Sequence, residues 1–168
     1  MEMKLSWGIG LLSLIIVFLV YPSCLHRYLA WEYGGEYLGS DGVRFQSREN
    51  NCGPASLAMV YDAFGIEAGE VEIERSIEMT GNGTTMLELL HHAERNGLSA
   101  KGLKLTMEEF RRNQFPAILF VHNDHFAVAD SVHEGEVYLR DPAIGRLKLS
   151  EKSLARIWHG EALVFCKK

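Results

Sequence analysis

The stretch Gln46-Ser-Arg-Glu-Asn-Asn-Cys52-Gly-Pro-Ala-Ser-Leu-Ala-Met-Val-Tyr-Asp-Ala-Phe-Gly65 changes at Cys52 from polar residues to a helical pattern. Pro54 falls in the first turn of that pattern, where its missing N–H costs nothing, and Gly65 is a typical helix stop. The apolar residues follow the spacing of one helical face, and they are Leu57, Val60, Tyr61 and Phe64. The stretch therefore predicts a helix that begins at or just after Cys52.

The place of Cys52 at a helix start predicts a nucleophile. The unpaired N–H groups and the positive end of the helix dipole stabilise a thiolate at such a position. The polar residues before Cys52 and the Gly-Pro after it favour an accessible side chain over a buried one. An inert packing cysteine is the alternative interpretation, and we assign that to Cys166, which lies in an apolar run.

A nucleophilic cysteine needs a base, and the segment 116–132 offers His125. Two β-type runs flank the polar tip His122-Asn-Asp124, so His125 would begin the second strand of a hairpin. In isolation, a histidine beside Phe126 would be interpreted as a hydrogen-bonded core residue. The presence of Cys52 favours the catalytic interpretation.

The base in turn needs a group that orients it, and Asp141 is the candidate. A third β-type run, residues 136–140, ends in Asp141-Pro142, a turn signal that places Asp141 at a strand end. Serving that turn alone is the alternative role for Asp141. Asp130 is a rival on the strand of His125, but its odd spacing from His125 predicts that it points to the opposite face.

The order and spacing of these motifs resemble the papain-like double-glycine peptidases. The motifs are Gln46, Cys52-Gly-Pro six residues later, a His-Phe strand, and Asp141-Pro142 sixteen residues after His125. The resemblance runs from about Phe45 to Phe165, and it includes Gly83-Thr-Thr85 and Trp158-His-Gly160. Members of this family are cysteine peptidases that process bacteriocin leaders, and they are often fused to the N-terminus of ABC exporters.

The resemblance implies a papain-like α+β fold and a role for each of four residues. Cys52 would be the nucleophile, His125 the base, Asp141 its orienting partner, and Gln46 a donor in the oxyanion hole. The substrate it implies is a peptide or protein whose leader is cut after Gly-Gly. For Gln46 the alternative is a glutamine that is merely solvated in a loop.

Composition limits the other functions. The length suits one domain, and 47% hydrophobic residues are enough to build a core. A net charge of −5 gives no electrostatic basis for binding nucleic acid, and three cysteines argue against a disulfide framework. His122, Asp124 and His125 resemble a metal set only in composition, since neighbouring strand positions point to opposite faces. We therefore expect no metal and no cofactor.

The N-terminus predicts a membrane anchor. Leu5 to Tyr21 is an apolar run without charge, near the lower length limit of a membrane span, with Trp7 and Tyr21 where interfacial aromatic residues belong. No signal-peptidase site is visible after it. We expect a single-pass protein of the bacterial inner (cytoplasmic) membrane, with its catalytic domain outside the cytoplasm.

The chain is thus divided into an anchor or signal segment at 1–25, a linker at 26–44 and a papain-like peptidase domain at 45–168. In the last of these, helices come first and an antiparallel sheet follows. Further helices are expected over 67–79, from a cap at Thr84 or Thr85 to Arg95, from Thr106 and over 150–158. Strands are expected between Pro116 and Leu149 and over 162–166.

Two other functions stay open. One is a different papain-like thiol hydrolase, such as a peptidoglycan amidase or a transglutaminase-like enzyme, which has the same Cys–His–Asp order. The other is a non-catalytic module that docks leader peptides, although all four polar groups of the site are present here. Neither a transporter membrane domain nor a nucleotide-binding motif occurs in the sequence, so any export transporter would be a separate partner.

Overall fold

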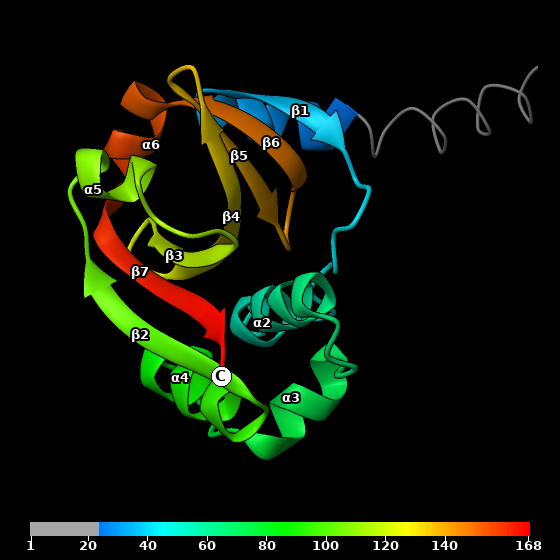
Figure 1. Ribbon diagram of the computed structural model, residues 1–168. Helices are drawn as coiled ribbons and strands as arrows, with labels where there is room; N and C mark the ends of the chain where they lie inside the picture. The colour runs from blue at the N-terminus through cyan, green and yellow to red at the C-terminus, as the bar shows by residue number, and fades with distance from the viewer. Residues whose placement is uncertain (1–23) are drawn as a thin grey trace, which may run out of the picture.

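The computed structural model describes residues 24–168, in which one antiparallel sheet of seven strands is flanked by short helices. The strand order is β1-β6-β5-β4-β3-β7-β2 (Figure 1). The strands are β1 (Gly35–Gly39), β2 (Leu98–Lys104), β3 (Ala117–Val121), β4 (His125–His133), β5 (Glu136–Asp141), β6 (Gly145–Ser150) and β7 (Trp158–Lys167). The helices are α2 (Cys52–Phe64), α3 (Glu70–Ser76), α4 (Met86–Arg95), α5 (Met107–Arg111) and α6 (Glu151–Ile157), and residues 24–32 are also helical.

Two apolar cores lie on opposite faces of this sheet. The first packs α2 and α4 against one face, and the second is closed by α6, α5 and the helix at 24–32. The central strands alternate between the cores, as in β3, where Ile118 faces the first core and Leu119 the second. Because both faces are covered, β3 is apolar along its whole length. The α+β architecture expected from the sequence is confirmed.

The helix that begins at Cys52 is confirmed, and the structure explains where it ends. Gly65 adopts φ 73°, and its N–H bonds the carbonyl groups of Asp62 and Tyr61, which is the left-handed ending that glycine permits. The expected helix over 67–79 is shorter, at Glu70–Ser76. Thr85 and Ser150 cap α4 and α6 as the sequence predicts.

The predicted linker over residues 26–44 is wrong for most of its length. Residues 24–32 are helical, Ala30 is fully buried in the second core, and β1 pairs with β6 along the edge of the sheet. The glycines in this segment are typical of a linker. However, Gly34 and Gly39 adopt φ 73° and 113°, and they lie where the chain turns before β1 and at its end. The sheet is therefore not confined to the C-terminal part, since β1 and β2 also belong to it.

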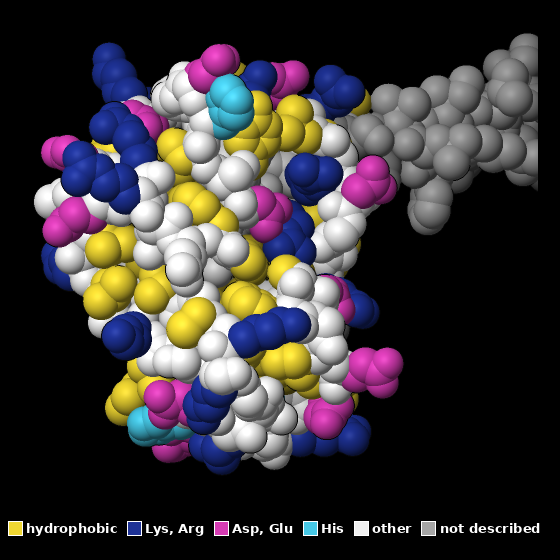
Figure 2. Space-filling view, viewed as in Figure 1, with side chains coloured by type: hydrophobic (Ala, Val, Ile, Leu, Met, Phe, Trp, Pro, Cys, Tyr) yellow, Lys and Arg dark blue, Asp and Glu magenta, His cyan; other side chains and the backbone are white. Residues whose placement is uncertain are grey.

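The predicted anchor at 1–25 lies outside the described residues except for its last two positions. Among residues 24–168, no helix has both the length and the apolar character needed to cross a bilayer. On the face shown in Figure 2, acidic and basic side chains are interspersed, and hydrophobic side chains show between them.

Candidate active site

Cys52 is the first residue of α2, and no nearby group neutralises the positive end of this helix. No side chain caps the helix, and its first turn contains no acidic residue. Asn51, which precedes the helix, instead accepts from the Arg48 backbone N–H and donates to Ser47 Oγ, each at 3.0 Å. No side chain therefore neutralises the positive end of the helix dipole, which lies at Cys52.

Cys52 is only 6% exposed, so the expectation of an accessible side chain is wrong. Its polar neighbours are engaged in the loop before α2 rather than turned to solvent with it. The small exposed fraction faces a cavity of about 480 Å³, whose lining also includes Thr84, Phe120 and Phe126. A substrate can thus reach the sulfur through this cavity, which we name the Cys52 cavity.

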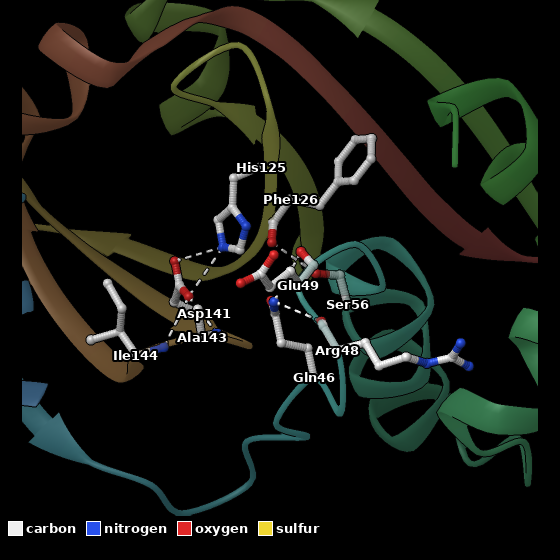
Figure 3. Close-up of polar contacts among 9 residues, drawn as sticks. All are labelled: Gln46, Arg48, Glu49, Ser56, His125, Phe126, Asp141, Ala143 and Ile144. Carbon is white, nitrogen blue, oxygen red and sulfur yellow. Dashed lines mark hydrogen bonds and ion pairs between the residues drawn. The ribbon is translucent and has the colours of Figure 1, made fainter. Parts of the chain in front are cut away.

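His125 and Asp141 meet across the strand pair β4–β5. His125 Nε2 lies 3.1 Å from both carboxylate oxygens of Asp141, whose side chain is fully buried (Figure 3). Asp141 Oδ1 also accepts backbone N–H bonds from Ala143 at 2.7 Å and Ile144 at 3.1 Å. Asp141 therefore holds the turn and the imidazole together, and the two roles weighed for it in the sequence are compatible.

The other nitrogen of the His125 ring faces away from Asp141, on the side of the start of α2 (Figure 3). Burial lowers the pKa of His125, but hydrogen bonds with the Asp141 carboxylate and the Cys52 thiol, and the charges of these groups, raise it to about 10. The imidazole is thus protonated at neutral pH. The arrangement suits an imidazolium beside a thiolate.

Asp130 is separated from this pair, as its spacing predicts. Its carboxylate binds the Arg140 guanidinium at 2.6 to 3.0 Å, and Arg140 also donates to the carbonyl of Gly42 at 3.1 Å. A shift in the β4–β5 register between Ala129 and Ser131 accompanies this position. Asp130 is therefore engaged in an ion pair and does not compete with Asp141.

Gln46 lies beside the same turn. Its backbone N–H donates to the carbonyl of Pro142 at 2.9 Å, which ties the loop before α2 to the end of β5. Its side-chain Nε2 donates to the carbonyls of Arg48 at 2.9 Å and Glu49 at 3.2 Å (Figure 3). Its Oε1 is buried without a hydrogen-bond partner among the described residues. The structure brings Gln46 close to the site, while its amide hydrogens are engaged within its own loop.

Two small residues of α2 fix the helix against the sheet. Ser56 Oγ donates to the backbone carbonyl of Phe126 at 3.2 Å, so one turn after Cys52 the helix is bonded to the residue after His125. At Gly53 a Cβ would lie 2.6 Å from Thr84 Cγ2, which leaves no room for a side chain. The Cys-Gly-Pro sequence thus serves the close packing that sets the distance between Cys52 and His125.

Sequence reasoning missed several residues that line the site. Glu49 and Asp124 line the Cys52 cavity, and they also line a second cavity of about 420 Å³ that includes His125 and Tyr33. The sequence suggests for Asp124 only a metal-ligand role, and it predicts a linker at Tyr33. Nothing local marks Tyr33, because it reaches the site through the pairing of β1 with a strand far downstream. Among residues 24–168, no group of three His, Cys, Asp or Glu side chains is arranged to hold a metal ion.

Comparison with known proteins identifies a family and several relatives of this chain. The sequence profile described as Peptidase C39 family matches residues 41–168. An uncharacterized protein of Methanothermobacter thermautotrophicus is 35% identical over 127 residues, which is 76% of this chain and 89% of that protein. The colicin V secretion/processing ATP-binding protein of Escherichia coli is 31% identical over 121 residues, and the match spans 72% of this chain but only 17% of the transporter.

Among solved structures, this chain is similar to a double glycine motif protease from an AMS/PCAT transporter, crystallised in complex with the leader peptide. The TM-score is 0.72 at 28% sequence identity, and the match covers 75% of this chain and 91% of the other. The family match begins at residue 41, so the helix at 24–32 and β1 both lie before it.

Proposed function

Because this chain belongs to the Peptidase C39 family of cysteine peptidases, we propose that it hydrolyses a peptide bond after a Gly-Gly leader site of a secreted peptide or protein. Cys52 is the nucleophile, His125 the general base and acid, Asp141 the orienting group and Gln46 an oxyanion donor. The observation that carries the proposal is that the hydrogen-bonded Asp141–His125 pair lies beside the uncapped start of α2, whose first residue is Cys52.

The chemistry follows from these positions. The Cys52 thiolate attacks the carbonyl carbon, and a tetrahedral oxyanion forms. The His125 imidazolium then gives its proton to the leaving amine as the C–N bond breaks, which leaves a thioester on Cys52. Water attacks that thioester while His125 takes a proton from it, and the thiolate is released with the carboxylic acid. Asp141 keeps the ring in the orientation that both proton transfers need.

The oxyanion is stabilised by the Cys52 backbone N–H and the Gln46 side chain, a kind of interaction worth about 3 kcal/mol per donor. Gln46 Nε2 is bonded to two neutral carbonyl groups, those of Arg48 and Glu49. A bond to a charged oxyanion is stronger than a bond to a neutral carbonyl, so the developing charge can draw one amide hydrogen away.

The substrate class is supported by the shape of the Cys52 side of the cleft. The Cys52 cavity adjoins an apolar groove of about 330 Å³, because both are lined by Thr84, Phe120 and Phe126. Apolar side chains of a leader would pack in the groove, and a narrow approach to a sulfur that is 6% exposed favours residues without side chains beside the scissile bond. The leader-bound neighbour makes a leader peptide the first substrate to test.

We expect the full chain, purified in detergent, to cleave peptides that carry an amphipathic leader and Gly-Gly. Peptides in which Val-Val replaces Gly-Gly should be cleaved at least about tenfold more slowly, since each extra apolar side chain must displace the cavity wall. Mass spectrometry of the products locates the cut. If no peptide is cleaved but iodoacetamide still labels Cys52, the thiol hydrolase stands and the substrate is wrong. If Cys52 is also unreactive, the leader-docking module replaces the peptidase.

For the location we propose that the apolar run Leu5–Tyr21 anchors the chain in the cytoplasmic membrane, with the peptidase domain outside and an export transporter as a separate partner. The helix that follows the run supports this, because its Leu25, Tyr28 and Trp31 are 41%, 53% and 70% exposed. Exposed aromatic residues next to an apolar run suit the bilayer interface.

The expected result is that the chain stays with membranes after carbonate extraction. Protease added outside right-side-out spheroplasts should then digest the domain, whereas a cytoplasmic control protein survives. Protection of the domain until the cells are lysed would reverse the orientation, and release by carbonate would contradict the anchor.

A further inference from the structure

The cleft contains two cavities that divide the proposed catalytic pair between them. The Cys52 cavity is lined by Cys52 but not by His125. The second cavity, of about 420 Å³, is lined by His125 but not by Cys52, together with Tyr33, Glu49, His122, Asp124 and Ala143. Glu49 and Asp124 line both, so the two cavities meet between the sulfur and the imidazole. We name the second one the His125 cavity.

Hydrolysis through a thioester gives each cavity a different part of the substrate. The acyl part stays bonded to the Cys52 sulfur, so the residues before the scissile bond occupy the Cys52 cavity. The leaving amine receives its proton from His125, so the residue that follows the scissile bond lies on the His125 side. We propose that the His125 cavity is a leaving-group subsite that selects a cationic residue directly after the cleaved bond. This inference rests on the proposed peptidase function.

Tyr33 forms a wall of this subsite, and it comes from the segment before the part of the chain that matches the family. Its backbone N–H bonds the carbonyl of Leu29 at 3.2 Å, and the next carbonyl, that of Gly34, accepts from Ser153 Oγ at 2.8 Å. Its ring meets the His122 ring edge-on with centroids 4.6 Å apart. Tyr33 is therefore held by the helix at 24–32, by α6 through its neighbour Gly34, and by the β3–β4 turn, so its position in the wall of the subsite is fixed.

The hydroxyl of Tyr33 stays a neutral phenol. Burial raises its pKa first, and the negative charges of Asp141, Asp124 and Cys52 raise it further. These same charges show that the phenol lies within electrostatic reach of the catalytic groups. A neutral hydroxyl at this place can accept a hydrogen bond from an ammonium or guanidinium group without adding charge of its own.

The charge of the subsite favours a cation. Among residues 24–168, Glu49 and Asp124 have no ion-pair partner, and no Lys or Arg lines either cavity. The His125 imidazolium also lines the second cavity, but its positive charge is balanced by the Asp141 carboxylate that it faces. The Glu49 and Asp124 carboxylates are both exposed, so each attracts a cationic side chain only modestly, by about threefold in kcat/KM. With both carboxylates acting together, we expect kcat/KM for a substrate with Lys after the scissile bond to exceed that for Glu by roughly tenfold.

The test compares peptides with one leader and one Gly-Gly site that differ only in the next residue, which is Lys, Gln or Glu. The ratio of kcat/KM for Lys over Glu is measured within each protein, so that any loss of folded protein cancels. Glu49→Gln and Asp124→Asn should each lower the ratio by about threefold. Glu134→Gln removes an exposed carboxylate in the β4–β5 turn, outside both cavities, and should keep the wild-type ratio.

Tyr33→Ala tests the wall separately. It opens the subsite, so cleavage before Trp relative to cleavage before Ser should rise by about fivefold, while Tyr33→Phe should keep the wild-type Trp/Ser ratio. A Lys/Glu ratio near one in the wild-type protein, or a ratio that neither carboxylate substitution changes, would overturn the subsite while the peptidase stands. Failure to cut any of the peptides would instead be a failure of the proposed function.

Discussion

Replacing Cys52 with alanine is expected to reduce cleavage of a Gly-Gly leader peptide by about 10⁴-fold or more. The substitution removes the only sulfur that lies at the start of α2 beside His125 within residues 24–168, and with it the covalent step. The remaining oxyanion donors and the cleft would still bind substrate. The measurement is kcat/KM with a leader peptide, followed by mass spectrometry.

Cys166→Ala is the matched control. The expectation that Cys166 is a packing residue is wrong, since it is a free cysteine on an exposed part of β7, far along the sheet from the cleft. This variant should keep wild-type activity. A Cys52→Ala protein should also keep its fold, since a small side chain is lost at the edge of a cavity, and binding of an uncleaved leader peptide would show this. If the Cys52→Ala protein still cuts after Gly-Gly, the nucleophile has been assigned to the wrong residue.

Asp141→Asn is expected to lower kcat by about 10²- to 10⁴-fold. An asparagine fits the same space and can still accept the backbone N–H bonds of Ala143 and Ile144 through its oxygen. It cannot supply the negative charge that His125 Nε2 faces at 3.1 Å. Asp130→Asn is the control for charge alone, because Asp130 binds Arg140 away from the site, and it should affect stability more than kcat.

Asp141→Asn is also expected to change the pH dependence of kcat/KM. The pKa of His125 is raised to about 10 in the folded protein, above its ordinary value of 6.5, and Asp141 is one cause. Without that carboxylate the folded pKa falls, so the alkaline limb of the kcat/KM profile should move to lower pH in Asp141→Asn. An alkaline limb that stays in place would show that Asp141 does not act through His125.

The free energy of unfolding should also depend on pH through the raised pKa of His125. A raised folded pKa stabilises the protein fully below pH 6.5, and the contribution is lost as the pH rises from there toward 10. Urea unfolding of the wild-type protein should therefore show a decrease in the free energy of unfolding over this range. In Asp141→Asn the decrease should be smaller, because less of the His125 shift remains.

The positions of several candidate site residues were predictable because they depend on local sequence patterns. The start of α2 follows from the change of pattern at Cys52, and the strand ends at His125 and Asp141 follow from the turn residues beside them. The exclusion of Asp130 required only the alternation of a strand. Each of these inferences depends on residues a few positions apart, which is the range over which helix and strand periodicity act.

The errors share one physical cause. Residues 26–44 were assigned to a linker because their glycines are typical of turns, yet β1 is stabilised by pairing with β6, which no local signal reports. The burial of Cys52 was missed because the hydrogen bonds of Asn51 within the loop were not visible from composition. In both cases the partner that decides the structure lies elsewhere in the fold.

The sequence by itself determined which residues are candidates for the catalytic site and on which kind of element each lies. Only the tertiary structure decided how they meet: Ser56 bonded to the carbonyl of Phe126, the Gln46 backbone bonded to Pro142, and Tyr33 placed in the cleft by β1. The reason is that local sequence fixes backbone dihedral preferences over a few residues. The distances between side chains in a cleft are set by strand pairing and core packing between segments far apart in the chain.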